Sequence, residues 1–255
     1  MSRPLIIAHR GASALAPENT LAAFRRAIDD GADGVEFDVR LAKDGVPVVH
    51  HDSSLRRTGH TDHLIADRTS AELGRTDVSG WFADAGDWKK QGVPTFAATL
   101  DLLRNFKGLI FVELKSDPGE SIEPLVRAVC DVIRRSPVAG RIIAKSFRIS
   151  FIPLFSALCP DVRTAALFAP KVMTILRKEK YLVDLAVEFG ADELSVHCSL
   201  ATKKLMKKAG KHGLPVTIWT VGNPRWLRRA VKLGINAVIT NNPARLIAKR
   251  DELRS

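Results

Sequence analysis

Short apolar runs alternate with longer amphipathic stretches from one end of the sequence to the other. The apolar runs have the length and the β-branched content of buried strands. They lie near residues 5–8, 33–39, 109–114, 141–146, 163–168, 192–197, 215–220 and 236–240. The stretches between them predict helices near 20–30, 97–106, 121–135, 148–158, 171–189, 202–212, 224–233 and 243–252.

Strands that alternate with helices form right-handed βαβ units and a parallel sheet. Eight such units suit closure into a (β/α)₈ barrel, an α/β fold for which 255 residues is an ordinary length. A doubly wound sheet with a lid is the alternative. The alternation is interrupted once, after the second strand. We interpret residues 52–94 as a small insertion in a single domain that spans residues 1–255.

The composition, with 45% hydrophobic and 26% charged residues, is that of a globular protein with a full core. No run approaches the roughly 18 consecutive apolar residues of a membrane span, and the first residues lack a signal-peptide pattern. We therefore expect a cytoplasmic protein without a membrane span. The three cysteines are widely spaced and predict neither a disulfide framework nor a metal motif. The sequence leaves the oligomeric state open.

The formal net charge is +11, which favours anionic partners such as phosphates, nucleic acids or acidic lipid headgroups. Much of the excess lies in two helical stretches, 203–208 and 225–232. These stretches lack the repeated aromatic side chains on which bases stack. We interpret them as solvated helix faces and expect no nucleic-acid partner.

Polar side chains follow or end several of the predicted strands. In a (β/α)₈ barrel the chemistry takes place at the carboxyl ends of the strands, so these side chains are candidates for the site. They are His9, Arg10, Glu36, Asp38, Glu113, Lys115, His197 and Trp219.

Three of the candidates are carboxylates. Glu36 and Asp38 are two residues apart, so strand alternation points both to one face, and Glu113 and Lys115 repeat this spacing on the next strand. Three carboxylates at one barrel mouth repel one another unless a cation or a proton lies among them. Oxygen ligands favour one hard divalent cation, Mg²⁺ or Ca²⁺. The alternative is two ordinary salt bridges, Glu36–Arg40 and Glu113–Lys115.

The histidines His9, His50 and His51 border this predicted metal site. An imidazole exchanges protons near neutral pH, so two of them on opposite sides of a phosphorus are suited to general acid–base catalysis. Arg10 and Lys115 are suited to binding phosphate oxygens and offsetting developing charge.

Five segments match the motifs of a known family, in the same order and across nearly the whole chain. They read AHRGASALAPENTLAAFRRAIDDGADGVEFDVRLAKDGVPVVHHD, GVPTFAATLDLL, FVELK, IWTVGNP and GINAVITNNP. The sequence therefore resembles the glycerophosphodiester phosphodiesterase family. The resemblance implies a (β/α)₈ barrel with a small insertion after the second strand. It also implies hydrolysis of a small anionic phosphodiester, a glycerophosphodiester, to an alcohol and glycerol 3-phosphate.

The resemblance also implies roles for individual residues. It implies that Glu36, Asp38 and Glu113 bind one divalent cation, Mg²⁺ or Ca²⁺. It implies that His9 and His51 are catalytic, because His51 is the histidine that precedes Asp52 in the motif. Arg10 and Lys115 would contact the phosphate. His197 and Trp219 are further candidates for binding the substrate.

The chain departs from the family pattern at Ala42, residues 96–98, Gly222 and Asn241. These departures lie where the shape of the substrate would be recognised, so the headgroup preference stays open. Attack by water and attack by a neighbouring hydroxyl of the substrate are both compatible with the sequence.

Two alternative functions remain. One is a lysophospholipase D-like hydrolase of lysophospholipids, which an exposed apolar rim made of Trp81, Phe82 and Trp88 in the insertion would favour. The other is a non-catalytic barrel that binds phosphorylated ligands.

Overall fold

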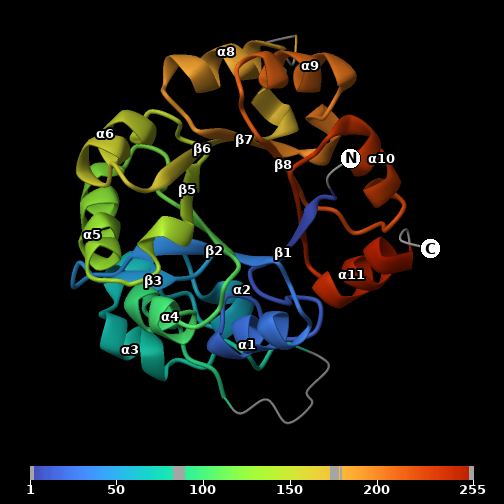
Figure 1. Ribbon diagram of the computed structural model, residues 1–255. Coiled ribbons are helices and arrows are strands. Elements are labelled where there is room, and N and C mark those ends of the chain that lie inside the picture. The colour runs from blue at the N-terminus through green and yellow to red at the C-terminus, as the bar shows by residue number, and fades with distance from the viewer. Residues whose placement is uncertain (1–2, 83–89, 173–177, 179, 253–255) are drawn as a thin grey trace.

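The computed structural model describes residues 3–82, 90–172, 178 and 180–252, and a closed barrel of parallel strands forms its centre (Figure 1). The parallel strands are β1 (Leu5–His9), β2 (Gly34–Leu41), β4 (Leu109–Leu114), β5 (Ile142–Ser146), β6 (Arg163–Phe168), β7 (Glu193–His197), β8 (Val216–Trp219) and β9 (Ala237–Thr240). Strand β1 pairs with both β2 and β9, which closes the barrel. The predicted barrel is confirmed, and closure excludes the open sheet.

Helices surround the barrel on its outside (Figure 1). They are α1 (Leu21–Asp29), α4 (Phe96–Leu102), α5 (Glu123–Arg134), α6 (Phe151–Leu158), α8 (Lys180–Glu188), α9 (Lys203–Lys211), α10 (Trp226–Leu233) and α11 (Pro243–Glu252). Short 3₁₀ turns occupy Ala139–Arg141, Pro170–Val172 and Cys198–Leu200. The helix predicted over 171–189 corresponds to one of these turns and to α8, and residues 173–177 and 179 lie outside the described residues.

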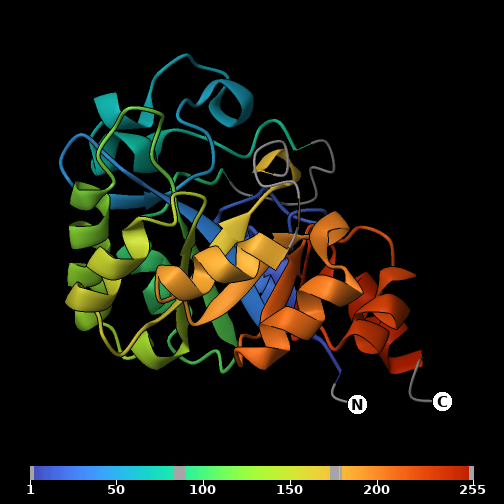
Figure 2. The same cartoon turned by 90° about the horizontal axis from the view of Figure 1, so that it is seen from above.

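The insertion follows β2 and contains strand β3 (Pro47–Val49), antiparallel to β2, and the helices α2 (Arg56–Gly59) and α3 (Ser70–Arg75). A 3₁₀ turn, Ile65–Asp67, lies between the two helices. The insertion has a small core of its own, made of Ala42, Val48, Leu55, Ile65, Leu73, Val78 and Val93. Figure 2 shows this blue-green segment beyond the end of the barrel opposite the N-terminus, where the strands have their carboxyl ends.

The two faces of each strand serve different purposes. On β2, Val35, Phe37 and Val39 belong to the core between the barrel and its helices, where the ring of Phe37 packs 5.3 Å from that of Phe24 on α1. Inside the barrel, a separate apolar cluster is made of Ile7, Phe111, Ile143, Ala165, Ala237 and Ile239. Because this cluster fills the barrel below its mouth, the next inward positions toward the carboxyl ends form the floor of a polar site.

The surplus cations lie on exposed helix faces, as expected. Lys203, Lys204 and Lys207 on α9 and Arg228 on α10 are all exposed. Among the helices of the described residues, none is long and apolar enough to cross a membrane.

The first turn after β1 requires glycine. Gly11 has φ +77°, and a Cβ there would lie 2.6 Å from the carbonyl carbon of Ala23. We expect Gly11→Ala to lower the free energy of unfolding by about 3 kcal/mol, because the strained backbone and the close contact with α1 add together. Urea unfolding monitored by circular dichroism measures this loss.

Gly45→Ala is the matched control. Gly45 has nearly the same φ, +75°, but no atom lies within 4 Å of a Cβ built there. This variant should lose only about 1 kcal/mol, the cost of the left-handed backbone alone. Equal losses in the two variants would contradict the role assigned to the contact with Ala23.

Candidate active site

The corner after β1 is shaped by three consecutive features of the sequence. The strand ends at His9, and Arg10 and Gly11 then adopt positive φ values of 55° and 77°. The chain returns to this corner through Asn19, whose backbone N–H donates to the carbonyl oxygen of Arg10 at 3.0 Å. Thr20 caps α1 by accepting from the N–H of Ala23. The segment therefore holds His9, Arg10 and Asn19 together at the mouth of the barrel.

Glu36, Asp38 and Glu113 form a compact group inside that mouth. One oxygen from each lies within 4.8 Å of the others, and all three residues are buried. Asp38 and Glu113 are register partners on the neighbouring strands β2 and β4. The structure thus brings together the three residues that the sequence predicts as metal ligands.

Three cations surround this carboxylate group. Lys115 Nζ lies 2.6 Å from Glu113 Oε1 and 3.2 Å from Asp38 Oδ1, and Arg10 Nε lies 3.2 Å from Asp38 Oδ2. Lys145 Nζ, from β5, lies 2.8 Å from Glu36 Oε1. The group is therefore held by cations from three separate segments of the chain.

Of the two salt bridges considered as the alternative to a metal site, one forms and one does not. The predicted Glu113–Lys115 pair forms, but Glu36 pairs with Lys145 instead of Arg40. Arg40 donates from Nε to the carbonyl oxygen of His51 at 2.9 Å and pairs with Asp117.

The charges of these carboxylates follow from their partners. Burial acts to raise the pKa of Asp38, but Lys115, Arg10 and His51 outweigh it and hold the pKa well below its ordinary value. Burial likewise acts on Glu36, and Lys145 and His9 lower its pKa. Both groups are ionised at neutral pH.

His9 and His51 are each oriented through Nδ1. The Nδ1–H of His9 donates to Asn241 Oδ1 at 2.6 Å, and its Nε2 lies 3.8 Å from Glu36 Oε2. The Nδ1–H of His51 donates to Asp52 Oδ1 at 2.7 Å. This assignment of the ring proton leaves Nε2 of each imidazole as the nitrogen that exchanges protons.

His50 differs from its neighbour. It is buried, its Nδ1–H donates to the carbonyl oxygen of Asp52, and its Nε2 accepts from the hydroxyl of Thr58, both at 2.9 Å. Burial lowers its pKa. Because both ring nitrogens are engaged within the protein, His50 is suited to a structural role.

A chain of ion pairs connects the two segments that carry His9 and His51. Arg10 pairs with Glu18 at 2.9 Å, and Glu18 pairs with Arg57 at 2.6 Å. Arg57 in turn pairs with Asp52 at 2.7 Å, next to His51. The insertion is thereby attached to the corner after β1 across the mouth of the barrel.

His197 and Trp219 belong to an aromatic wall on the mouth. The ring of Trp219 packs 5.4 Å from that of His197 and 5.6 Å from that of Phe147, which is exposed. Lys115 Nζ lies 5.9 Å from the centre of the Phe147 ring. The two predicted substrate-binding residues are thus in contact with each other, and Phe147 links them to Lys115.

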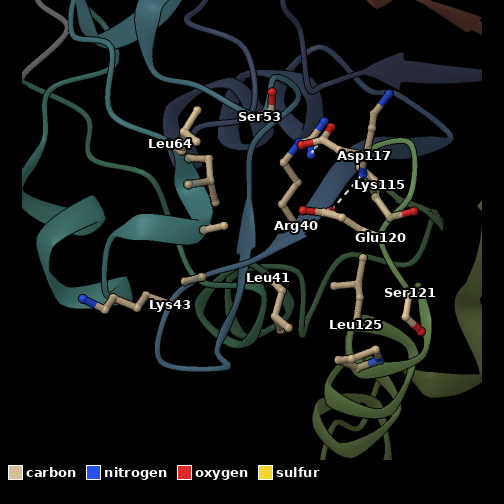
Figure 3. A pocket seen from close by; sticks show the side chains of 15 residues that line it. Arg40, Leu41, Lys43, Ser53, Leu64, Lys115, Asp117, Glu120, Ser121 and Leu125 are labelled. Atoms are coloured by element: carbon tan, nitrogen blue, oxygen red, sulfur yellow. Dashed lines mark hydrogen bonds and ion pairs between the residues drawn. The ribbon is translucent and has the colours of Figure 1, made fainter.

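A cavity of about 590 Å³ lies beside the carboxylate group, between β2, the insertion and the loop before α5 (Figure 3). Arg40 and Asp117 form an ion pair on one side of it, and Lys115, which pairs with the carboxylate group, also lines it. The rest of the lining includes the apolar side chains Leu41, Ala42, Leu64, Ile65, Ala66, Pro124 and Leu125.

Trp81 and Phe82, two of the residues expected to form an exposed apolar rim on the insertion, pack against other parts of the protein. Trp81 and Phe82 are half-buried and pack against each other at 5.7 Å. The Nε1–H of Trp81 donates to the carbonyl oxygen of Val78, and Arg57 covers its ring. Trp88 lies outside the described residues.

Sequence reasoning missed three residues of the site, and it assigned one of them, Asn241, to recognition of the substrate's shape, whereas the structure places it against His9. Asn19 donates to Asp38 Oδ2 at 2.9 Å, Asn241 holds His9, and Lys145 holds Glu36. Only Lys145 carries a local signal, because a lysine inside the apolar run of a buried strand requires an internal partner.

Comparisons with known proteins find relatives across nearly the whole chain. Residues 9–245 match the model of the glycerophosphoryl diester phosphodiesterase family. A glycerophosphodiester phosphodiesterase of Caldanaerobacter subterraneus subsp. tengcongensis is 30% identical over 249 residues, which cover 96% of this chain and 97% of the relative.

Two solved structures illustrate the likeness of the fold. A phosphodiesterase of Oleispira antarctica, in complex with the product sn-glycerol-3-phosphate, is 26% identical with a TM-score of 0.87, over 98% of this chain and 97% of its own. A glycerophosphodiester phosphodiesterase of Agrobacterium tumefaciens is 25% identical with a TM-score of 0.78, over 96% and 99%.

The barrel, its insertion and these relatives first define the class, a phosphodiesterase built on a (β/α)₈ barrel. Since the family model covers nearly the whole chain, the protein belongs to the glycerophosphoryl diester phosphodiesterase family. The resemblance stated from the sequence motifs is confirmed.

A fourth buried acid, Glu193, lies inside the barrel. Burial raises the pKa of Glu193, on β7, from its ordinary 4.5 to about 7, against the lowering effects of Arg163, Thr217 and Lys145, while Asp192 adds to the increase. Between pH 4.5 and 7 the carboxyl ionises in the unfolded chain but stays protonated in the folded one. Stability is therefore lost as the pH rises through this interval.

Glu193→Gln should remove that loss. Relative to the wild type, the variant should gain about 3 kcal/mol of unfolding free energy between pH 4 and pH 8. Denaturant unfolding at several pH values measures the difference. A difference between variant and wild type that is constant with pH would show that Glu193 titrates at its ordinary value when folded.

Proposed function

We propose that this protein is a metal-dependent phosphodiesterase that hydrolyses glycerophosphodiesters to an alcohol and glycerol 3-phosphate. The observation that carries the proposal is the group of three buried carboxylates flanked by His9 and His51, in a chain of this family. We treat residues 1–255 as one catalytic domain, with the insertion at about 52–94 supplying one side of the site.

Glu36, Asp38 and Glu113 are suited to holding one divalent cation, Mg²⁺ or Ca²⁺. Their oxygens lie within 4.8 Å of one another, Glu36 and Asp38 are ionised, and oxygen donors are what hard cations prefer. When bound, such an ion supplies Lewis-acid polarisation of the phosphoryl group and offsets its charge.

His9 and His51 are the proposed acid–base pair. One accepts the proton of the attacking hydroxyl, and the other donates a proton to the leaving oxygen. Asp52 Oδ1 accepts from the Nδ1–H of His51 at 2.7 Å and fixes the orientation of that ring. Asn241 fixes the ring orientation of His9. Attack by water gives the alcohol and glycerol 3-phosphate in one step. Attack by a neighbouring hydroxyl of the substrate releases the alcohol and gives a cyclic phosphodiester, which water then opens to glycerol 3-phosphate. Both routes need one group that accepts a proton and one that donates a proton.

The remaining candidates bind the substrate. Arg10 and Lys115 lie beside the carboxylate group with side chains partly accessible to solvent, so both can reach phosphate oxygens. His197 and Trp219 provide a wall for the organic part of the substrate. Within the described residues, the Nε1–H of Trp219 is buried and has no hydrogen-bond partner.

Lysophospholipase D-like activity is the second candidate. The cavity of about 590 Å³ beside Lys115 has several apolar lining residues, among them Leu41, Ile65 and Leu125, and its volume exceeds the need of a small headgroup. An acyl chain in this cavity would explain its apolar lining.

The roles of the histidines are tested by substitution. We expect His9→Ala and His51→Ala to lower kcat by about a hundredfold to ten-thousandfold, because each removes one proton transfer. Circular dichroism should show an unchanged fold. His212→Ala, an exposed histidine at the end of α9, is the control and should retain wild-type kcat.

A separate experiment tests which of His50 and His51 is catalytic. His50→Ala should lower the thermal stability, since it leaves Thr58 without a buried partner, while keeping kcat at a temperature where the variant is folded. Loss of turnover in His50→Ala together with normal turnover in His51→Ala would reverse the assignment.

The substrate class is tested with metal-free protein. After EDTA treatment and desalting, turnover of glycerophosphocholine and of lysophosphatidylcholine should be absent, and Mg²⁺ or Ca²⁺ should restore it. Mass spectrometry of the products should find glycerol 3-phosphate and choline from the former. Lysophosphatidic acid from the latter would establish the second candidate. Turnover that is indifferent to the chelator would remove the metal from the proposal.

A further inference from the structure

The ammonium group of Lys145 approaches the carboxylate group from the interior of the barrel. It faces the barrel interior on β5 as the register partner of Glu113, and its side chain is 2% exposed. Its Nζ lies 2.8 Å from Glu36 Oε1 and 3.9 Å from Glu113 Oε2. A charge buried to this extent requires a partner inside the protein.

Every carboxylate oxygen of the group lies near a cation or an N–H donor of the chain itself, but within the described residues Glu36 Oε1 and Glu113 Oε1 make ion pairs without hydrogen-bond geometry. For Glu36, Oε1 faces Lys145, and Oε2 accepts from the backbone N–H of Arg10 at 3.2 Å. For Asp38, Oδ1 faces Lys115, and Oδ2 faces Arg10 Nε and the amide of Asn19. For Glu113, Oε1 faces Lys115 and Oε2 faces Lys145.

The charges are balanced as well. Glu36, Asp38 and Glu113 carry three negative charges when ionised, and Arg10, Lys115 and Lys145 carry three positive charges. A divalent ion at this group would therefore be repelled by the ammonium groups and compete with them for the same carboxylate oxygens.

The two lysines differ in where they can go when displaced. The side chain of Lys115 is 14% exposed at the mouth, so it can turn toward solvent or toward a phosphate. Lys145 has no such route at 2% exposure and must remain in the barrel interior.

We propose that Lys145 is an internal competitor of the divalent ion, which weakens ion binding and moves from Glu36 to Glu193 when an ion binds. The proposal rests on the proposed function only for the identity of the ion's ligands. It concerns binding and is independent of turnover.

Glu193 is suited to receive the displaced ammonium. Lys145 and Glu193 both register with Ala165, from the two sides of β6, so both face the same interior. Glu193 is buried, and Thr217 donates to its Oε1 at 3.2 Å. Within the described residues its Oε2 has no hydrogen-bond partner. Lys145 already acts on it electrostatically.

The main test is the affinity of the metal-free protein for Ca²⁺, measured by isothermal titration calorimetry at pH 8 and low salt. Lys145→Gln should bind Ca²⁺ more tightly, by about tenfold or more, because the competing charge is gone while a neutral donor to Glu36 remains. The rise of Tm with added Ca²⁺ should be larger in this variant. A merely structural role would make binding weaker, not tighter.

Lys208→Gln is the matched control, since it removes the same charge from a surface pair with Asp184. Its Ca²⁺ affinity should stay within about twofold of the wild type. An equal tightening in both lysine variants would ascribe the effect to net charge and overturn the proposal.

Glu193→Gln tests the second partner. It should weaken Ca²⁺ binding severalfold, because the displaced ammonium loses its acceptor. In the background of Lys145→Gln the same substitution should have no effect on affinity, a non-additive pair. Additive effects would overturn the movement to Glu193. If Lys145→Gln does not fold, Glu193→Gln still decides, since unchanged affinity in it contradicts the proposal.

Failure of this proposal and failure of the proposed function are distinguishable. Ca²⁺ binding that is equal in the wild type and in Lys145→Gln overturns the competition alone. Absence of Ca²⁺ binding in both the wild type and Lys145→Gln overturns the proposed competition together with the assignment of the metal ligands. The predicted changes in affinity without any turnover of phosphodiesters would support the competition and remove the catalytic proposal.

Discussion

The burial of three carboxylates within 4.8 Å of one another is the constraint on which the rest of the site depends. Such a group is stable only if positive charge surrounds it, because neither repulsion nor desolvation is offset by solvent. The chain supplies that charge from the corner after β1, from the residue after β4 and from β5, through Arg10, Lys115 and Lys145. The positions of these three segments are therefore coupled through one electrostatic interaction.

The barrel makes this arrangement possible by separating apolar and polar layers. Phe111 belongs to the apolar cluster inside the barrel, and Glu113, two residues later on the same strand, belongs to the carboxylate group. The apolar layer excludes water from below, so the ion pairs above it are stronger than they would be at a surface. The pairs from Arg10 through Glu18 and Arg57 to Asp52 then fix the insertion over the same mouth.

Features with a local period were predictable from the sequence. The alternation of strands and helices gives the barrel, and the spacing of Glu36 and Asp38 places both on one face, as the structure confirms. Contacts between distant segments were not predictable, because they depend on strand register and loop conformation. Asn241 meets His9 across 232 positions, and Lys145 meets Glu36 only because β4 and β5 align Glu113 with Lys145. The catalytic role of His51 rests on a motif and remains a prediction.

Lys115 and Lys145 have identical side chains, but their different depths in the barrel suit them to different roles. Both contact Glu113, but Lys115 ends at the mouth and Lys145 ends below it. A cation with access to solvent can leave its carboxylate partner and pair with an incoming phosphate at little cost in free energy. A buried cation can leave one buried carboxylate only if another buried carboxylate takes its place. The mouth thus has one cation suited to the substrate, and the barrel interior has one suited to the ligands of the ion. Glu193 gives the buried cation its second acid.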